Sequence, residues 1–478
     1  MRISVFKPTV LALIVLSGFT VAKAQQPVDS LMHYLEIAAK NNPTVLQKYS
    51  EYQAALQKVP QVGSLPDPDL SIGIFLSPME LVGGNQVADI RLMQMFPWFG
   101  VLKAAKDEMS LMAKAKYESF RDAKLQVFFD VQRTSYEYQK IKQDIRISEK
   151  NVEILRSIER LSLVKFKSAS INDGNTSQDK RVSRATQSAT NGSANMQIMN
   201  ENTGNASDAA ATTNMQGSAM GTSTGGSGLA DIYRIQIEIG EIENSIALLR
   251  NQKNTVGARF NSYLNRPMEH AIYLSDTLIS DTLSLSLLTA SDSMLTNNPM
   301  LGMLQYEKQS LAARERMVAR MGYPMVGLGV NYTVINKNPM STSSMNGKDM
   351  VMPMITVTLP IYRNKYKAIR NEAKYQREAT EHGYTTTSNS LQTEYYQAIQ
   401  QYHDAQRRIK LYENQSAITK RTLEIMVKSY SVSDVVLTDI LRVRQQALDY
   451  EFKQIEAVAD YNTATAWIKR LMAFSQTK

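Results

Sequence analysis

The chain contains the same order of motifs twice, and this duplication constrains the fold more than any other feature of the sequence. Asn41-Asn42-Pro43 recurs as Asn297-Asn298-Pro299. Farther along, the segment from Ile145 to Glu149 resembles that from Ile409 to Glu413, at an offset of 264 residues. A repeat of this length predicts one structural unit that is built twice.

The second copy lacks one segment that the first copy has. From the match of Leu229 with Leu437 onward the offset falls from 264 to 208, so the first copy is longer by 56 residues. The extra residues are confined to 167–228, where the composition changes to mostly Ser, Thr, Asn, Gly, Ala and Gln. Such low complexity is typical of a loop. We therefore expect a long insertion at 167–228, where the second copy has a short turn.

Each copy is predicted to fold as a helix broken at its Asn-Pro, two strands and a long helical hairpin. Proline disfavours helix at the preceding residue, and alternating apolar residues predict strands. Apolar residues spaced three and four apart predict long helices packed side by side as in coiled coils. The expected strands cover about 68–76, 88–96, 325–335 and 351–359, and the expected hairpin helices cover 101–166, 229–264, 362–430 and 437–472.

Residues 1–24 are predicted to be a signal peptide. A basic start and a short apolar run precede Ala22-Lys23-Ala24, which fits a cleavage site. The two repeats then cover 25–267 and 268–478. No later segment has the roughly 18 uninterrupted apolar residues that a membrane-spanning helix requires.

Composition excludes several kinds of site and partner. The chain has no cysteine, which excludes disulfides, thiolate metal sites and cysteine nucleophiles. Its four histidines are scattered singly, so we expect no histidine-built zinc site. The charge of +9 includes no dense basic block, which argues against nucleic acid as a partner. The one enzyme-like motif, Gly221 to Gly225, lies in low-complexity sequence, so we expect neither an enzyme nor a cofactor.

Four strands per chain are too few to close a membrane barrel. Open strand edges are not tolerated in lipid, where no water satisfies their amides and carbonyls, and eight strands is the smallest usual barrel. We therefore expect several chains to pool their strands, with the helical hairpins forming a continuous cylinder beneath. The alternative is a soluble helical scaffold or stalk, in the periplasm or at the surface, whose strands are merely hairpins.

The chain resembles the TolC-type outer-membrane efflux factors, and most closely the branch that serves heavy-metal exporters. The resemblance depends on the duplication, on the segments from Met95 to Gly100 and from Thr358 to Tyr362, and on Lys365. It implies a mainly α-helical homotrimer with a 12-stranded β-barrel in the outer membrane and an α-helical barrel through the periplasm of a Gram-negative-type cell. Its partners would be outer-membrane lipid, a periplasmic adaptor and an inner-membrane pump of the proton-driven RND type. The channel would give passive exit to heavy-metal ions or drugs.

The resemblance also places a periplasmic gate at the helix that follows each hairpin turn. Asp439 matches the first acidic position of the family pattern, while Arg442 occupies the second. Asp231 and Arg234 are the equivalents in the first copy, and Asp434 lies in the turn. The alternative is that these are solvated residues at helix starts, where the helix dipole favours Asp.

Methionine is abundant, with 25 residues, and four of them lie in the insertion: Met196, Met199, Met215 and Met220. Thioethers suit soft ions such as Cu(I), and by the same reasoning Ag(I), so these residues are candidate contacts for such an ion. Met340, Met345 and Met350 lie between the two later strands. The alternative is a polar loop with too few methionines to bind a metal.

Overall fold

The structure, a computed structural model, describes residues 30–173, 227–281, 287–430 and 436–473. The expected signal peptide and most of the insertion lie outside these residues. The chain divides into two compact units. Unit 1 is formed by Met1–Ile145, Leu249–Gln415 and Tyr450–Lys478, and unit 2 by Arg146–Leu248 and Ser416–Asp449.

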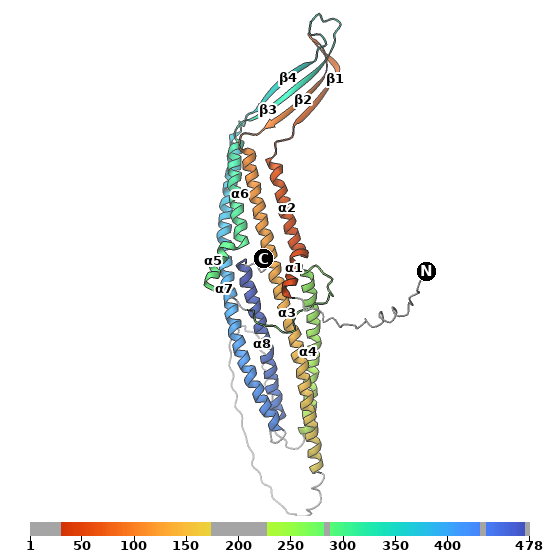
Figure 1. The fold of residues 1–478 in the computed structure, drawn as a ribbon, viewed down its shortest axis with the longest axis vertical. Helices are drawn as coiled ribbons and strands as arrows, with labels where there is room; N and C mark the ends of the chain where they lie inside the picture. Colours follow the sequence, from red (N-terminus) through yellow and green to blue (C-terminus); the bar gives the residue numbers. More distant parts are fainter. Residues whose placement is uncertain (1–29, 174–226, 282–286, 431–435, 474–478) are drawn as a thin grey trace, which may run out of the picture. The chain divides into compact units, whose positions relative to one another are not determined.

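The order helix, helix, strand, strand, helix, helix occurs twice along the chain, as the duplicated motifs predict (Figure 1). The first repeat contains α1 (Leu31–Asn41), α2 (Pro43–Gly63), β1 (Asp69–Leu81), β2 (Gly84–Phe96), α3 (Val101–Asp173) and α4 (Ser227–Tyr263). The second repeat contains α5 (Leu287–Asn297), α6 (Pro299–Met321), β3 (Met325–Asn336), β4 (Met350–Thr358), α7 (Arg363–Tyr430) and α8 (Leu437–Leu471).

The four strands form one antiparallel sheet in unit 1, in the order β1-β2-β3-β4. The central pair places Leu92 opposite Val330, and β1 places Leu70 opposite Leu92. Strands β1 and β2 are longer than the sequence predicts, because pairing continues past two irregularities, between Ile74 and Met79 and between Gln86 and Ala88. The sheet therefore has two free edges, β1 and β4.

The second asparagine of each Asn-Asn-Pro motif both caps a helix and joins it to the end of its repeat. Asn42 Oδ1 accepts from the backbone N–H of Thr44 at 2.9 Å, while its Nδ2 donates to Tyr263 O at 2.8 Å. Asn298 repeats both contacts, to Met300 N at 3.0 Å and to Leu471 O at 3.1 Å. Both asparagines are buried. The identical geometry confirms that the motif marks the same structural position in both copies.

Each repeat has its own hydrophobic core in unit 1. The core of the first repeat contains Tyr34, Phe128 and Phe260, from α1, α3 and α4. The core of the second contains Met294 and Ile468, together with residues of α6 and α7. Burial of such side chains contributes about 25 cal/mol for each Å² removed from water, so the two cores hold the helical layers of unit 1 together.

The long helices bury the stripe that the spacing of apolar residues predicts. On α3 this stripe includes Ile141, Ile145, Val152 and Leu155, none more than 9% exposed. One boundary differs from the prediction, because α3 continues to Asp173, into the segment assigned to the insertion. No glycine or proline interrupts the sequence before Gly174, so nothing in it ends the helix at Phe166. Among the described residues, no helix is both long enough and apolar enough to cross a membrane.

Three carboxylates on α3 are buried in unit 1, those of Glu108, Glu118 and Asp144, and Asp144 is the least exposed of them. Asp144 is 7% exposed, and burial raises its pKa from 3.8 to about 6. The nearby Lys140 ammonium lowers this pKa, while the Glu456 carboxylate raises it further. Burial disfavours the ionised form because the protein interior solvates a charge less well than water does.

The asparagine caps are testable with a matched control inside each motif. We expect Asn42→Ala and Asn298→Ala each to lower the free energy of unfolding by about 1–3 kcal/mol, because each leaves buried polar groups without a partner. Asn41→Ala and Asn297→Ala change exposed residues and are expected to have little effect. Guanidinium unfolding followed by circular dichroism measures all four. Equal stabilities of the two classes of variant would contradict the role of the buried asparagine.

The buried Asp144 predicts a pH dependence of stability. Because its pKa is higher in the folded than in the unfolded chain, the folded state binds the proton more tightly, and the free energy of unfolding falls as pH rises from about 4 to 6. Asp144→Asn is expected to remove this fall and to stabilise the protein at pH 7 by on the order of 3 kcal/mol. Unfolding curves between pH 4 and 7.5, with Asp404→Asn as an exposed control, provide the test. If the free energy of unfolding varied with pH in the same way in the wild type and in Asp144→Asn, Asp144 would not be the cause of the pH dependence.

Candidate functional site

The candidate gate residues that the structure describes lie near the starts of α4 and α8, in unit 2. The neighbouring apolar residues anchor these helix starts, since Ile235 and Ile440 are fully buried. Asp434 lies outside the described residues. The charged side chains therefore project from two helix starts whose other faces are packed.

Asp439 and Arg442 form an ion pair within α8. Arg442 Nη2 donates to Asp439 Oδ1 at 2.9 Å, and the two side chains are 71% and 46% exposed, respectively. An exposed pair of this kind contributes roughly 0–1 kcal/mol to stability. In a single chain, Arg442 thus neutralises the charge of Asp439.

Asp231 and Arg234, the equivalents in the first repeat, have different partners. Arg234 Nη1 donates to Thr438 Oγ1 at 2.9 Å, which joins α4 to the start of α8. Burial raises the pKa of Asp231, while Arg234 and Lys165 lower it. The two helix starts are therefore joined by a polar contact that the sequence pattern does not predict.

A buried pair, Arg444 and Asn151, also joins two helices of unit 2. Arg444 is 5% exposed and Asn151 is 2% exposed, and Arg444 Nε donates to Asn151 Oδ1, which links α8 to α3. The sequence patterns do not predict this pair. The sequence does contain a sign that Arg444 is buried. Arg444 lies four residues after Ile440 and three before Ala447, at a position of the apolar stripe of α8. Polar residues at such positions fix the register of packed helices.

The last residue of α7 is also held to α3. Tyr430 OH lies 3.2 Å from Ser162 Oγ, and Lys165 Nζ donates to the Tyr430 carbonyl at 3.3 Å. The same ammonium lies 4.3 Å from the centroid of the Tyr430 ring, within the range of a cation–π interaction. Three contacts thus fix the last residue of α7.

The sheet of unit 1 carries apolar side chains on a face that is exposed. We call it the apolar face. Successive residues of each strand point alternately to this face and to the opposite one. Ile74 is 73% exposed and Ile355 is 75% exposed. The apolar face is formed by Leu70, Ile72, Ile74, Ile90, Leu92, Phe96, Val326, Leu328, Val330, Ile355 and Val357. A sheet in water covers such a face with helices or with a second sheet.

The opposite face, which we call the polar face, carries the charged and hydroxyl side chains. Asp89 lies opposite Thr333, and the two side chains share a hydrogen bond of 3.4 Å. Asn331 is only 7% exposed. The polar face therefore includes more enclosed side chains than the apolar face, the reverse of the arrangement in a soluble protein.

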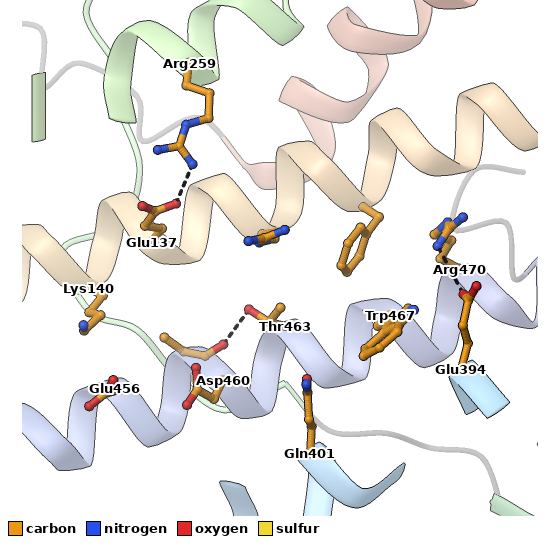
Figure 2. Close-up of a pocket in the computed structure, with 13 residues that line it drawn as sticks. Glu137, Lys140, Arg259, Glu394, Gln401, Glu456, Asp460, Thr463, Trp467 and Arg470 are labelled. Atoms are coloured by element: carbon orange, nitrogen blue, oxygen red, sulfur yellow. Dashed lines mark hydrogen bonds and ion pairs between the residues drawn. The ribbon is translucent and has the colours of Figure 1, made fainter. Parts of the chain in front are cut away.

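Unit 1 also contains a cavity of about 620 Å³ lined by helices α3, α4, α7 and α8. Figure 2 shows the side chains of α3 and α8 projecting toward one another across it. Arg259 binds Glu137 at 3.1 Å, and Arg470 lies 3.9 Å from Glu394. The charged lining residues are Arg133, Glu137, Lys140, Arg259, Glu394, Glu456, Asp460 and Arg470. Acids and bases balance, so the cavity does not select a ligand by the sign of its charge.

No metal centre is formed by the usual ligands in the described part of the chain, where no group of three or more His, Cys, Asp or Glu lies close enough together to hold an ion. Met196, Met199, Met215 and Met220 lie outside the described residues. In the loop between β3 and β4, Met340 is 92% exposed and Met345 59%. These two methionines are surface residues of the loop.

Sequence comparisons identify no relative of this chain. No protein-family model matches the sequence, and no curated protein matches it.

Comparison of structures, in contrast, finds several proteins with the same fold. The outer membrane protein VceC from Vibrio cholerae superimposes with a TM-score of 0.66 at 11% identity, over 93% of this chain and 96% of VceC. The open MtrE outer membrane channel from Neisseria gonorrhoeae gives a TM-score of 0.66 at 12% identity, over 93% and 88%. The Campylobacter jejuni CmeC outer membrane channel gives 0.62 at 14% identity, over 94% and 87%. The chain therefore has the fold of these outer-membrane proteins over nearly its whole length.

Proposed function

We propose that the protein is the outer-membrane channel of a tripartite efflux system. One observation carries this proposal: the four-stranded sheet exposes its apolar face and has two unpaired edges. An exposed apolar patch of this extent indicates a binding surface or a membrane. Strands of 9 to 13 residues are long enough to cross a bilayer when tilted.

The free edges explain why the channel is an oligomer. In lipid, the unpaired N–H and C=O groups of β1 and β4 would each cost several kcal/mol. Pairing β4 of one chain with β1 of the next satisfies these groups. Three chains of four strands give a closed barrel of twelve, with the apolar face toward lipid and the polar face toward the pore. A homotrimer is the assembly that the TolC-type resemblance implies.

The helices supply the part of the duct outside the membrane. In this proposal α3, α4, α7 and α8 of three chains form a barrel that extends into the periplasm of a Gram-negative-type cell. Helices longer than 60 residues, such as α3 and α7, cover about 100 Å at 1.5 Å per residue. A periplasmic adaptor and an inner-membrane pump of the RND type would supply cargo and energy, so transport through this chain is passive. Heavy-metal ions or drugs are the cargo that the resemblance suggests.

The residues at the starts of α4 and α8 are proposed to form the periplasmic gate. A threefold axis would bring Asp439 and Arg442 of three chains into rings, and rings of charged side chains control which ions pass a constriction. The contact of Arg234 with Thr438 and the burial of Arg444 against Asn151 support this assignment, because they hold the helix starts in place. Asp231 and Asp434 complete the proposed set; Asp434 lies outside the described residues.

The alternative is a soluble scaffold or stalk. The apolar face argues against it, because no helix of the described residues packs on that face to remove it from water. A stalk would also have no use for a sheet whose polar side chains lie on the more enclosed face.

Planar bilayers test both the channel and its gate. We expect the detergent-purified protein to conduct ions, and Asp439→Ala and Arg442→Ala each to change conductance or cation selectivity by about twofold or more, since each removes one ring of charge. Asp404→Ala and Arg407→Ala are the matched controls, because these residues form an exposed ion pair of the same spacing on α7, at 3.0 Å. A preparation that conducts no ions would contradict the channel. Conductance and selectivity that are equal in all four variants and the wild type would reject the gate alone.

A further inference from the structure

Methionine in β2, β3 and β4 lies on one face only. Met93 and Met95 on β2, and Met352 and Met354 on β4, share the polar face with Asp89, Arg91 and Asn331, as the register shows. The paired positions of β2, β3 and β4 on the apolar face contain no methionine, although that face consists mostly of large apolar residues. A requirement for hydrophobic side chains alone does not explain this separation.

Two glycines of β3 form the floor between these methionines. Met93 and Met354 lie opposite Gly329 on its two sides, and Met95 lies opposite Gly327. Adjacent strands lie about 4.8 Å apart, so the backbones of β2 and β4 are about 10 Å apart across β3. A methionine side chain is unbranched and has three rotatable bonds, so those of Met93 and Met354 can turn toward each other over Gly329.

The glycines are needed for this arrangement. The Met95 Sδ lies over Gly327, where an added Cβ atom would approach it to 2.6 Å. A Cβ atom at Gly329 would come within 2.8 Å of the Leu92 carbonyl oxygen. Any larger residue at either position would therefore displace the strand or the thioether. Met93, Met95 and Met354 are each only partly buried, so their sulfurs remain accessible to a solute.

Three thioethers on one wall have a defined chemistry. Thioether sulfur is a soft, uncharged ligand that selects soft cations such as Cu(I). Hard cations such as Mg²⁺ and Ca²⁺ prefer oxygen ligands, and thioethers do not attract them. Asp69 on β1 lies opposite Met93, and its carboxylate adds a negative charge at the edge of the three methionines.

We propose that Met93, Met95 and Met354 form a binding site for a soft monovalent cation, Cu(I) or Ag(I), on the pore-facing wall of the sheet. This inference rests on the proposed function, because only in a barrel does the polar face line the route of the cargo. The site deepens that function by assigning a cargo class. It also differs from the candidate contacts in the insertion, since all three of its residues lie in paired strands.

Methionine oxidation with residue-level detection tests the site. The full-length protein in detergent is treated with hydrogen peroxide, with and without silver nitrate in chloride-free buffer, and sulfoxide at each methionine is measured by peptide mass spectrometry. We expect Ag(I) to slow oxidation of Met93, Met95 and Met354 about tenfold, because coordination draws electron density from the sulfur and makes it a weaker nucleophile toward the oxidant. The exposed Met340 and Met345 serve as internal controls. Equal protection of all five, or of none, would overturn the proposal.

A variant separates this inference from the channel function. Met93→Leu/Met95→Leu/Met354→Leu keeps the side-chain volumes and is expected to lose one Ag(I) per chain in equilibrium dialysis, while still conducting K⁺ in planar bilayers. Met340→Leu/Met345→Leu is the control and is expected to keep the wild-type silver content. If the triple variant conducts K⁺ but binds as much silver as the wild type, the proposed site is wrong and the channel function stands. Absence of conductance in the wild type would instead contradict the channel, and the oxidation pattern would still report on the site.

Discussion

In the proposed channel, the structure depends on the hydrogen-bonding requirement of a backbone in lipid. A sheet with an exposed apolar face is stable only where water does not reach that face, but the same environment leaves the groups at β1 and β4 without solvent partners. Both conditions are met together when sheets from several chains close on one another. The inverted faces of this sheet and its open edges are thus two consequences of one design. In water the open edges would be solvated, but the exposed apolar face would be unfavourable.

The duplication allows one chain to supply two hairpins and two pairs of long helices with the same geometry. Asn42 and Asn298 fix equivalent points of the two repeats, each joining a helix start to the end of its own repeat. The two cores of unit 1 are equivalent in the same way. In unit 2, by contrast, the repeats have diverged, because Arg442 pairs with Asp439 whereas Arg234 reaches Thr438. Divergence at the helix starts, where a gate would lie, is expected if the two repeats have different tasks in opening.

Sequence periodicity predicted the architecture well because the features behind it are local. Alternation identifies a strand, three-four spacing identifies a packed helix, and an Asn before a proline identifies a cap, without knowledge of the neighbours. The details that were missed depend on pairing between distant segments. Pairing of β1 with β2 past the irregularity after Ile74 lengthened the strand, and nothing in the sequence ended α3 at Phe166. The partnership of Arg444 with Asn151, and the placement of Met93 and Met354 beside Gly329, follow from helix and strand register, which a single sequence does not specify.

The most direct test of this account asks whether β1 of one chain lies beside β4 of another. The chain has no cysteine, so introduced cysteines are unique. In a single chain β1 and β4 are three strand spacings apart, about 14 Å, which a thiol crosslinker of roughly 8 Å does not span. The doubly substituted Ser71→Cys/Thr356→Cys protein, together with versions shifted by two residues along β4, is predicted to give a covalent trimer in denaturing gels, while neither single variant crosslinks. A closed ring of three chains would be contradicted if every version gave only monomers in the gel, or if crosslinking gave a ladder of species larger than trimers.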